Sequence, residues 1–274
     1  MNCCFANQSK EECSICDASE ITDNAVLGGR LRLKQPRRGH RVGHDAILLA
    51  AATGARAGDH VVELGAGVGA AGLAVALRTN GARVTLVERD PGLAALAAEN
   101  AERNGIADRV RAVVLDVAAP AREFTAAGLK AGSADRVLMN PPFSDPARHR
   151  LSPDLRRRAA HASSPDTLAQ WLRTSFRLLA SEGILTMIWR ADELGRVLSA
   201  LESCQGGGAA VIPVHPRADR PAIRILIRVV KGSRAPFALH SGLALAEASG
   251  EPTAAAEAVL REGGLLPLAR AQAG

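Results

Sequence analysis

Short apolar runs alternate with longer segments of helical periodicity from residue 60 onward. Apolar runs of about four to eight residues predict strands, whereas apolar residues spaced three and four apart predict amphipathic helices. This alternation is typical of βαβ units, which build a mostly parallel sheet with helices on both faces. The predicted strands are 61–64, 83–88, 110–117, 135–140, 183–189, 210–214 and 222–230. The predicted helices between them are 68–78, 91–104, 165–179 and 191–203.

The last two predicted strands, 210–214 and 222–230, are too close in sequence for a crossover helix. We therefore expect them to form an antiparallel pair at the edge of the sheet. Three glycines at 206–208 predict a flexible break before this pair. The pattern as a whole predicts an α/β fold with a seven-stranded, mostly parallel sheet and an antiparallel edge strand.

The flanking segments resemble additions to one domain more than a second core. Residues 31–35 alternate like a strand, residues 45–52 have a helical pattern, and residues 253–261 predict a short final helix. We therefore predict a single domain over residues 25–274. Its parts are an N-terminal segment at 25–57, a core at 58–232 and a C-terminal addition at 233–274.

The composition is that of a globular protein with a basic excess. Of 274 residues, 47% are hydrophobic and 23% are charged, which excludes disordered and fibrous classes. The net charge is +6, and basic residues concentrate at 24–44, 144–161 and 217–234. If these runs surround one pocket, they favour an anionic partner such as nucleic acid. Because the chain lacks a membrane-spanning apolar stretch and a signal-peptide pattern, we expect a cytoplasmic protein.

Four of the five cysteines, Cys3, Cys4, Cys13 and Cys16, lie near the N-terminus. The odd total favours a reducing compartment over a disulfide framework. The Cys13-x-x-Cys16 pair with Cys3 or Cys4 has zinc-like spacing, but adjacent Cys3 and Cys4 are awkward ligands for one tetrahedral ion. We therefore predict a disordered extension over residues 1–24, or an overlong gene start, and no metal site.

A glycine-rich turn follows the first strand of the core. The run Glu63-Leu-Gly65-Ala-Gly67-Val-Gly69 lies where strand gives way to helix, so backbone N–H groups can approach a ligand there. Gly65, Gly67 and Ala70 also satisfy the relaxed dinucleotide pattern G-x-G-x-x-A. Glu63 argues against a dinucleotide, because its carboxylate would face an anionic pyrophosphate, whereas it would attract the ammonium group of S-adenosylmethionine.

Carboxylates also end the next two strands. Glu88 ends the second strand, where it can accept both hydroxyls of a ribose from either kind of nucleoside cofactor. Asp116 ends the third strand and can accept a hydrogen bond from an adenine amine. Its alternative role is that of an ordinary turn or capping aspartate.

The sequence Asn140-Pro141-Pro142-Phe143 ends the fourth strand, on the side of the sheet where ligands bind in such folds. Consecutive prolines fix φ and remove two backbone donors. The side-chain carbonyl of Asn140 and the backbone carbonyl of Pro141 can then accept both hydrogens of an –NH₂ group. Phe143 can stack on a planar substrate. The alternative is a rigid turn with a core phenylalanine.

The glycine turn, Glu88, Asp116 and the Asn-Pro-Pro-Phe turn together resemble the motifs of class I S-adenosylmethionine-dependent methyltransferases that modify exocyclic or amide nitrogens. The segment 35–50, with Gly43 and Asp45, resembles the bacterial tRNA adenine-N6 methyltransferase family, which acts beside the anticodon of a valine tRNA. Stretches near 221–236 and 242–245 are also similar to that family.

The resemblance implies a Rossmann-like fold, S-adenosylmethionine as cofactor, tRNA as partner, and methylation of the exocyclic N6 of an adenosine. It also implies two sets of site residues. The cofactor-binding residues are Glu63, Gly65, Gly67, Gly69, Glu88, Asp116, Asn140, Gly43 and Asp45. The catalytic residues are Asn140, Pro141, Pro142 and Phe143.

Other functions remain open at this point. Methyltransferases of protein glutamine, DNA adenine and rRNA guanine also use an Asn-Pro-Pro-aromatic turn. A dinucleotide oxidoreductase would leave residues 140–143 without a role, and a non-catalytic RNA-binding module would not need them. Many relatives have tyrosine where this chain has Phe143, and the chain has no tyrosine. The stacking surface is therefore retained, but a phenolic hydrogen bond is not.

Overall fold

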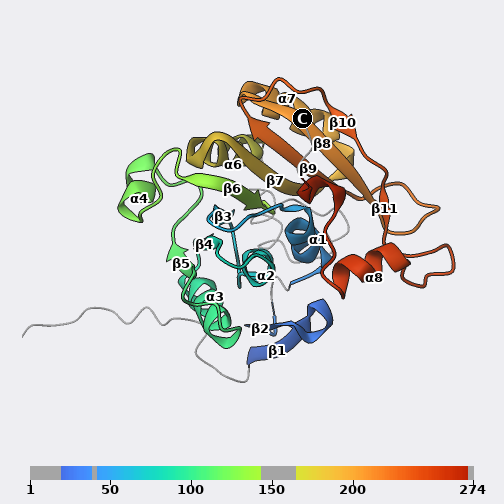
Figure 1. The fold of residues 1–274 in the computed structure, drawn as a ribbon, viewed down its shortest axis with the longest axis horizontal. Coiled ribbons are helices and arrows are strands. Elements are labelled where there is room, and N and C mark those ends of the chain that lie inside the picture. Colours follow the sequence, from blue (N-terminus) through green and yellow to red (C-terminus); the bar gives the residue numbers. More distant parts are fainter. Residues whose placement is uncertain (1–19, 39–41, 143–164, 271–274) are drawn as a thin grey trace, which may run out of the picture.

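The computed structural model describes residues 20–38, 42–142 and 165–270. These residues form a nine-stranded, mostly parallel sheet with helices on both faces (Figure 1). The strand order is β10-β8-β9-β7-β6-β3-β4-β5, and β11 also pairs with β8. The strands are β3 His60–Leu64, β4 Arg83–Glu88, β5 Val110–Val114, β6 Ala134–Met139, β7 Leu179–Arg190, β8 Gly206–His215, β9 Arg224–Lys231, β10 Ala238–Leu239 and β11 Leu243–Ala244.

The helices agree with the predicted pattern, and the structure adds the short helix α4. Helix α3 illustrates the local causes: it begins at Pro91, whose fixed φ suits the first turn, and the Asp90 side chain caps the N–H groups of Gly92 and Leu93 at 2.8 and 3.0 Å. Within the described ranges, no helix combines the length and apolar character needed to span a membrane. The helices are α1 His44–Ala52, α2 Ala70–Arg78, α3 Pro91–Arg103, α4 Ala121–Ala126, α6 Pro165–Leu178, α7 Leu194–Ser203 and α8 Ala254–Leu260. The 3₁₀ helices are η2 Leu27–Gly29, η4 Ala191–Glu193 and η5 Pro267–Ala269.

Both faces of the sheet are buried, because successive side chains of a strand point to opposite faces. In β3, Val61 belongs to the apolar core shared with α1, α2 and α3. Its neighbour Val62 belongs to the second core, shared with α4, α6 and α7. The structure thus confirms the predicted α/β class with a mostly parallel sheet.

Two details of the predicted sheet are wrong. The described sheet has nine strands instead of seven, because the short strands β10 and β11 both pair with β8. The antiparallel strand β9 lies between β7 and β8, not at the edge. The connection from β7 through α7 leaves the width of one strand between β7 and β8. Strand β9 occupies this position and pairs with both.

The glycine run at 206–208 is part of β8, not a flexible break. Gly206 pairs with Lys231 of β9, and the register shifts between Gly207 and Ala210. A Cβ on Gly206 would lie 2.8 Å from the Phe176 ring, and one on Gly207 would lie 1.9 Å from the carbonyl oxygen of Ser233. These glycines are therefore explained by close packing around a bulged strand.

An antiparallel hairpin precedes the sheet. Its strands are β1 Ile21–Val26 and β2 Leu31–Pro36, with Ile21 opposite Pro36 and Val26 opposite Leu31. Residues 21–24 therefore belong to the folded domain, and the predicted boundary at 24/25 falls too late. Residues 21–24 are ordered as a strand because they pair with β2, and the local sequence of 21–24 does not indicate this pairing.

Asn100 of α3 and the C-cap residue of that helix, Asn104, bind the open edge of β2. The side chain of Asn104 accepts from the N–H of Arg32 at 3.0 Å and donates to its carbonyl at 2.8 Å. One helical turn earlier, Asn100 makes the same pair of bonds with Lys34, at 2.7 and 3.0 Å. The two amides replace a neighbouring strand, so this edge of the hairpin is satisfied by a helix.

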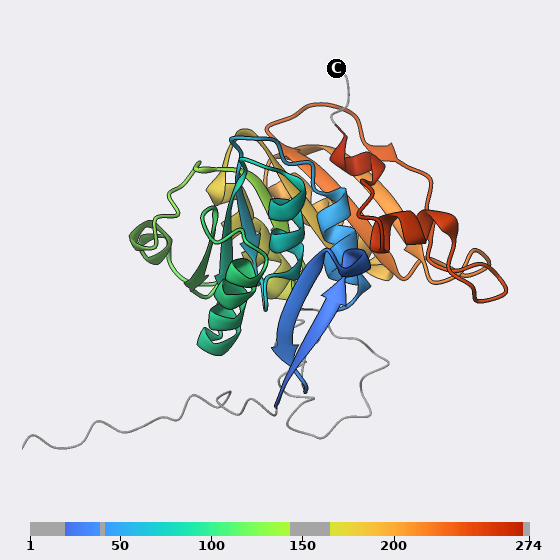
Figure 2. The same cartoon turned by 60° about the horizontal axis from the view of Figure 1, so that its bottom comes forward.

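The C-terminal addition covers α1. The N–H of Leu266 donates to the carbonyl of Ala51 at 2.9 Å. A Cβ on Gly54 would lie 2.1 Å from the Ala269 carbonyl oxygen, so the two segments touch through their backbones. Figure 2 shows this red segment beside α1, and the turn of the blue hairpin lies next to it, where Arg30 donates to the carbonyl of Arg261 at 3.1 Å.

Candidate functional site

The glycine turn and the Asn140 turn begin side by side. Strands β3 and β6 are parallel neighbours, and Leu64 is opposite Met139 in their register. Gly65 and Asn140 each follow these paired residues, and neighbouring strands are about 4.8 Å apart. The two predicted motifs therefore meet at the edge where strands β3 to β7 end, which we call the carboxyl edge.

The three glycines of the turn meet different surroundings. A Cβ on Gly65 would lie 2.3 Å from the Trp171 ring, and one on Gly69 would lie 2.8 Å from Leu86. A Cβ on Gly67, whose φ is +56°, would meet no atom within 4 Å. Gly65 and Gly69 are thus required by packing inside the protein, whereas Gly67 keeps open space in front of its backbone. This is the arrangement that a closely approaching ligand needs.

Glu88 connects the glycine turn to the turn before α3. The side chain is only 8% exposed. One carboxylate oxygen accepts from the N–H of Gly67 at 2.8 Å, and the other accepts from the N–H of Asp90 at 2.9 Å. Since each carboxylate oxygen can accept a second hydrogen bond, Glu88 retains the capacity to receive two hydroxyls.

Glu63 has a structural partner that the sequence did not indicate. One of its carboxylate oxygens accepts from the N–H of Gly72 at 2.7 Å, in the first turn of α2. The N-cap residue of that helix, Gly69, has no side chain, so Glu63 caps the helix from the preceding strand. Burial raises the pKa of Glu63 to about 8; the Gly72 hydrogen bond opposes this and the nearby Glu88 charge adds to it.

The Asn140 turn presents a buried acceptor. The side-chain carbonyl oxygen of Asn140 is buried, and within the described part of the chain it has no hydrogen-bond partner. Pro141 is buried and Pro142 is exposed, whereas Phe143 lies outside the described residues. An unpaired buried carbonyl costs roughly 1–3 kcal/mol, so its presence points to a donor that a ligand would bring.

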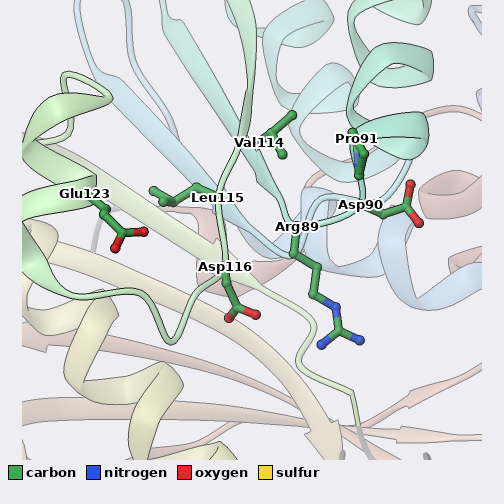
Figure 3. A pocket seen from close by; sticks show the side chains of 7 residues that line it. All are labelled: Arg89, Asp90, Pro91, Val114, Leu115, Asp116 and Glu123. Carbon is green, nitrogen blue, oxygen red and sulfur yellow. The ribbon is translucent and has the colours of Figure 1, made fainter. Parts of the chain in front are cut away.

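A pocket of about 530 Å³ lies at the ends of β4 and β5 (Figure 3). Val114, which is 56% exposed, forms an apolar surface there. Asp116 lines the pocket, and its carboxylate accepts from the N–H of Ala118 at 2.7 Å, so it also has the predicted turn role. The pocket thus offers an apolar surface beside the carboxylate of Asp116. Its lining residue Arg89 directly follows Glu88 in the sequence. Its lining residues are Arg89, Asp90, Pro91, Val114, Leu115, Asp116 and Glu123.

The segment before α1 reaches the same edge but has its own partner. Gly43 is the exposed N-cap residue of α1. The carboxylate of Asp45 pairs with the Nε of Arg224 at 3.1 Å. Arg224 lies opposite Arg190 at the end of β7, which locates this ion pair at the carboxyl edge. The observed partner of Asp45 is thus Arg224. A hydrogen bond from a cofactor to Asp45 stays a prediction.

Many basic residues of the predicted runs are paired within the protein. In the hairpin, Arg32 pairs with Asp23 at 3.2 Å and Lys34 pairs with Glu99. Strand β9 runs away from the carboxyl edge, so Lys231 lies at the opposite end and donates to the carbonyls of Phe176 and Leu179. Basic residues near the carboxyl edge are Arg190, Arg217, Arg220 and Arg224. They too are ion-paired: Arg190 with Asp192, Arg217 and Arg220 with Asp219, and Arg224 with Asp45. The run at 144–161 lies almost wholly outside the described residues.

Asn100 is a site-supporting residue that the sequence reading missed. It is fully buried, and besides its bonds to β2 it donates to the carbonyl of Val68 at 3.1 Å. It therefore joins the glycine turn to the hairpin. The sequence signal was an asparagine on the apolar stripe of the helix, in line with Ala97 and Ala101.

The described residues contain no group of three or more His, Cys, Asp or Glu side chains that could hold a metal ion. The question of a zinc site at Cys3, Cys4, Cys13 and Cys16 lies outside the described residues.

Comparison with known proteins gives one family match. A family model described as methyltransferase small domain matches residues 41–200. A solved structure of a predicted O-methyltransferase from Agrobacterium tumefaciens aligns with a TM-score of 0.68 and 29% identity, over 81% of this chain and 98% of that one.

Sequence relatives carry names that specify different acceptors. A 23S rRNA (uracil(1939)-C(5))-methyltransferase of Acidithiobacillus ferrooxidans is 38% identical over 41% of this chain and 25% of its own length. A tRNA1(Val) (adenine(37)-N6)-methyltransferase of Porphyromonas gingivalis is 30% identical over 56% of this chain and 60% of its own. One of the same name from Dyadobacter fermentans is 26% identical over 72% and 78%. The match thus spans less than two thirds of the first two relatives.

Proposed function

Because the chain belongs to the methyltransferase small domain family, whose members use S-adenosylmethionine, we propose that it methylates the exocyclic N6 of an adenosine in tRNA. The family establishes a methyltransferase and removes the dinucleotide oxidoreductase alternative. The choice of nitrogen and of tRNA is the proposal. It is supported by the Asn140 turn and by the relatives named as tRNA adenine-N6 methyltransferases.

The observation that carries the proposal is the buried side-chain carbonyl of Asn140 beside the glycine turn, which has no hydrogen-bond partner among residues 20–38, 42–142 and 165–270. An acceptor in this state suits an N–H donor on the substrate. The backbone carbonyl of Pro141, followed by a second proline, provides the other acceptor. Two acceptors at one bend match the two hydrogens of an –NH₂ group.

The residues present fit the cofactor. We assign Glu88 to the ribose hydroxyls, because one of its oxygens bonds the N–H of Gly67, where a Cβ would meet open space. The apolar surface with Val114 and Leu115 suits the adenine ring, and Asp116 suits its amine. Glu63 is a buried carboxylate just before the glycine turn, and we assign it to the ammonium group, whose charge would favour the ionised form of this acid.

When bound, S-adenosylmethionine supplies an electrophilic methyl group on a positively charged sulfur. The chain's own contribution is to hold the acceptor amine. Asn140 and Pro141 accept its two N–H groups, which favours a localised lone pair on the nitrogen and stabilises the positive charge that develops there. The excess proton can leave to water, so a strong general base among the site residues is not required.

Basic residues at the carboxyl edge support RNA as the substrate class in this proposal. Arginines of β7, β9 and the loop between β8 and β9 lie there and are ion-paired with Asp192, Asp45 and Asp219, so a phosphate would share or replace these carboxylates. Arg37 and Arg38 are exposed at the open end of the hairpin. Such groups suit phosphates around a base that is turned out of its stack. We expect the binding constant for RNA to fall steeply with salt, by about 0.7–0.9 log units per log unit of salt for each phosphate contact.

The deciding experiment is incubation with methyl-labelled S-adenosylmethionine and either total RNA, DNA or protein, followed by mass spectrometry of nucleosides from separated tRNA and rRNA, and of peptides. Labelled N6-methyladenosine in tRNA supports the proposal. Label in methylglutamine, in rRNA guanine or in DNA adenine would reassign the substrate, since the same two carbonyls can hold those amines. Cofactor binding without transfer to any of them would favour a non-catalytic RNA-binding module.

A further inference from the structure

One face of helix α6 contacts the ends of three strands. Thr174 and Ser175 follow Trp171 by three and four residues, so all three lie on that face. The Thr174 hydroxyl donates to the carbonyl of Val117, just beyond Asp116, at 2.9 Å. The Ser175 hydroxyl lies 3.4 Å from the sulfur of Met139, the residue before Asn140. The same helix therefore supports the turns assigned to the cofactor and to the acceptor.

Trp171 is the member of this face that touches the glycine turn. A Cβ on Gly65 would lie 2.3, 3.1 and 3.4 Å from Cη2, Cζ3 and Cζ2 of its indole. The outer edge of the six-membered ring thus presses on the backbone of Gly65. Thr174 and Ser175 are almost fully buried, whereas Trp171 is partly exposed. Trp171 therefore packs at the margin of the second apolar core, not at its centre.

We propose that Trp171 is a positioning residue that sets the spacing between the glycine turn and the Asn140 turn. The proposal rests on the proposed function, in which the methyl donor is held at the first turn and the amine at the second. Leu64 and Met139 are already paired, so the strands fix the starting points of both turns. Beyond the last paired residues, the indole limits how far Gly65 can move toward α6. A displacement of about 1 Å at such a site costs about a hundredfold in rate.

The test compares the two tryptophans of the chain. In Trp171→Phe the outer ring is lost, so we expect about a tenfold lower kcat and a several-fold weaker Kd for S-adenosylmethionine, with the KM for the RNA acceptor within twofold. The matched control is Trp189→Phe, which removes a buried indole on β7 and its 2.9 Å hydrogen bond to Glu193. We expect the control to lower Tm without changing kcat or the cofactor Kd.

A spectroscopic measurement separates positioning from general packing. The chain has two tryptophans and no tyrosine, so in the Trp189→Phe variant Trp171 is the only tryptophan. Its emission should change on titration with S-adenosylmethionine and saturate at the Kd measured by calorimetry. Wild-type kcat and Kd in Trp171→Phe, or an emission that does not respond to bound cofactor, would overturn the proposal alone. If the wild-type protein binds no cofactor in the calorimeter, the proposed function is wrong and this proposal with it.

Discussion

The two edges of the central sheet differ in how their polar side chains are satisfied. At the edge where the parallel strands begin, which we call the amino edge, His60 is bonded through both ring nitrogens, to the Ser133 carbonyl at 2.8 Å and the Thr85 hydroxyl at 3.0 Å. Its backbone N–H donates to Asp135 at 2.7 Å. Lys231 donates to two carbonyls at the same edge. Protein groups satisfy these two side chains. Among the described residues, Arg109, Arg136 and Arg177 at this edge each have one buried guanidinium nitrogen without a hydrogen-bond partner. Each of these guanidinium groups has another contact, with the carbonyl of Ala76, with Asp59 and with the Phe124 ring respectively.

At the carboxyl edge the polar groups are only partly satisfied. Within the described ranges, the carbonyl of Asn140 has no partner, and Glu63 and Glu88 are held by backbone N–H groups without an ion pair to Lys or Arg. Polar groups in such a state lower stability unless a ligand completes their hydrogen bonds. The difference is one of chemistry: the unpaired atoms at the amino edge belong to guanidinium groups that have other contacts inside the protein, whereas at the carboxyl edge the unpaired atom is the side-chain acceptor of Asn140, which suits a ligand donor.

The largest effect should come from removing the buried acid of the carboxyl edge. The folded state keeps the Glu63 proton up to pH about 8, whereas the unfolded state loses it near 4.5. Stability should therefore fall as pH rises from about 4.5 to 8, by roughly 5 kcal/mol at most. Glu63→Gln keeps an acceptor for Gly72 and should remove this loss. Denaturant unfolding between pH 5 and 8 measures it, with the exposed Glu123→Gln as control; an unchanged slope in Glu63→Gln would contradict the assignment.

The next effect concerns the unpaired acceptor. Asn140→Ala should lower kcat by about 10²–10³-fold, equivalent to roughly 3–4 kcal/mol of transition-state stabilisation, while cofactor affinity stays near that of the wild type. Single-turnover methyl transfer and calorimetry measure the two quantities. Ser133→Ala at the amino edge is the control and should retain full kcat. Equal rates for Asn140→Ala and wild type would remove Asn140 from the mechanism.

Two glycine substitutions separate packing from ligand space. Gly65→Ala should destabilise the fold by about 2–4 kcal/mol, because the new Cβ meets Trp171 at 2.3 Å and φ is +69°. Gly67→Ala should cost only about 1–2 kcal/mol, since its Cβ meets open space. It should nevertheless weaken cofactor binding at least tenfold. Thermal unfolding and calorimetry on both variants test this; tight cofactor binding by Gly67→Ala would show that the space has another use.

The smallest effect belongs to the amino edge. Burial, the largest cause, lowers the pKa of His60. Below pH 6.5 the unfolded state takes up a proton that the folded state resists, so stability should decline as pH falls through that value and level off below the folded pKa. His60→Gln should reduce this loss of stability below pH 6.5 without changing kcat. A loss of methyl transfer in His60→Gln with an intact fold would show that the two edges are not separate in function.

Much of the fold was predictable because its signals are local. The bounds of β4 follow from an apolar run, and the start of α3 follows from Asp90 and Pro91. The hairpin strand β1 was missed because its partner, β2, lies beyond a short turn and its own pattern is weak. The position of β9 between β7 and β8 was also missed, since the order of strands depends on pairing between segments far apart in the chain.

The sequence by itself determined the family chemistry: the glycine turn, Glu88 and the Asn140 turn each occupy a strand end, and strand ends can be read from hydrophobic pattern. Only the tertiary structure decided which of these groups meet. The register between Leu64 and Met139 joins two turns 75 residues apart. Glu63 caps α2, and Asn100 connects the hairpin to Val68. Acids near the hairpin neutralise part of its basic run. Such partners are set by packing between distant segments, which no local pattern of side chains specifies.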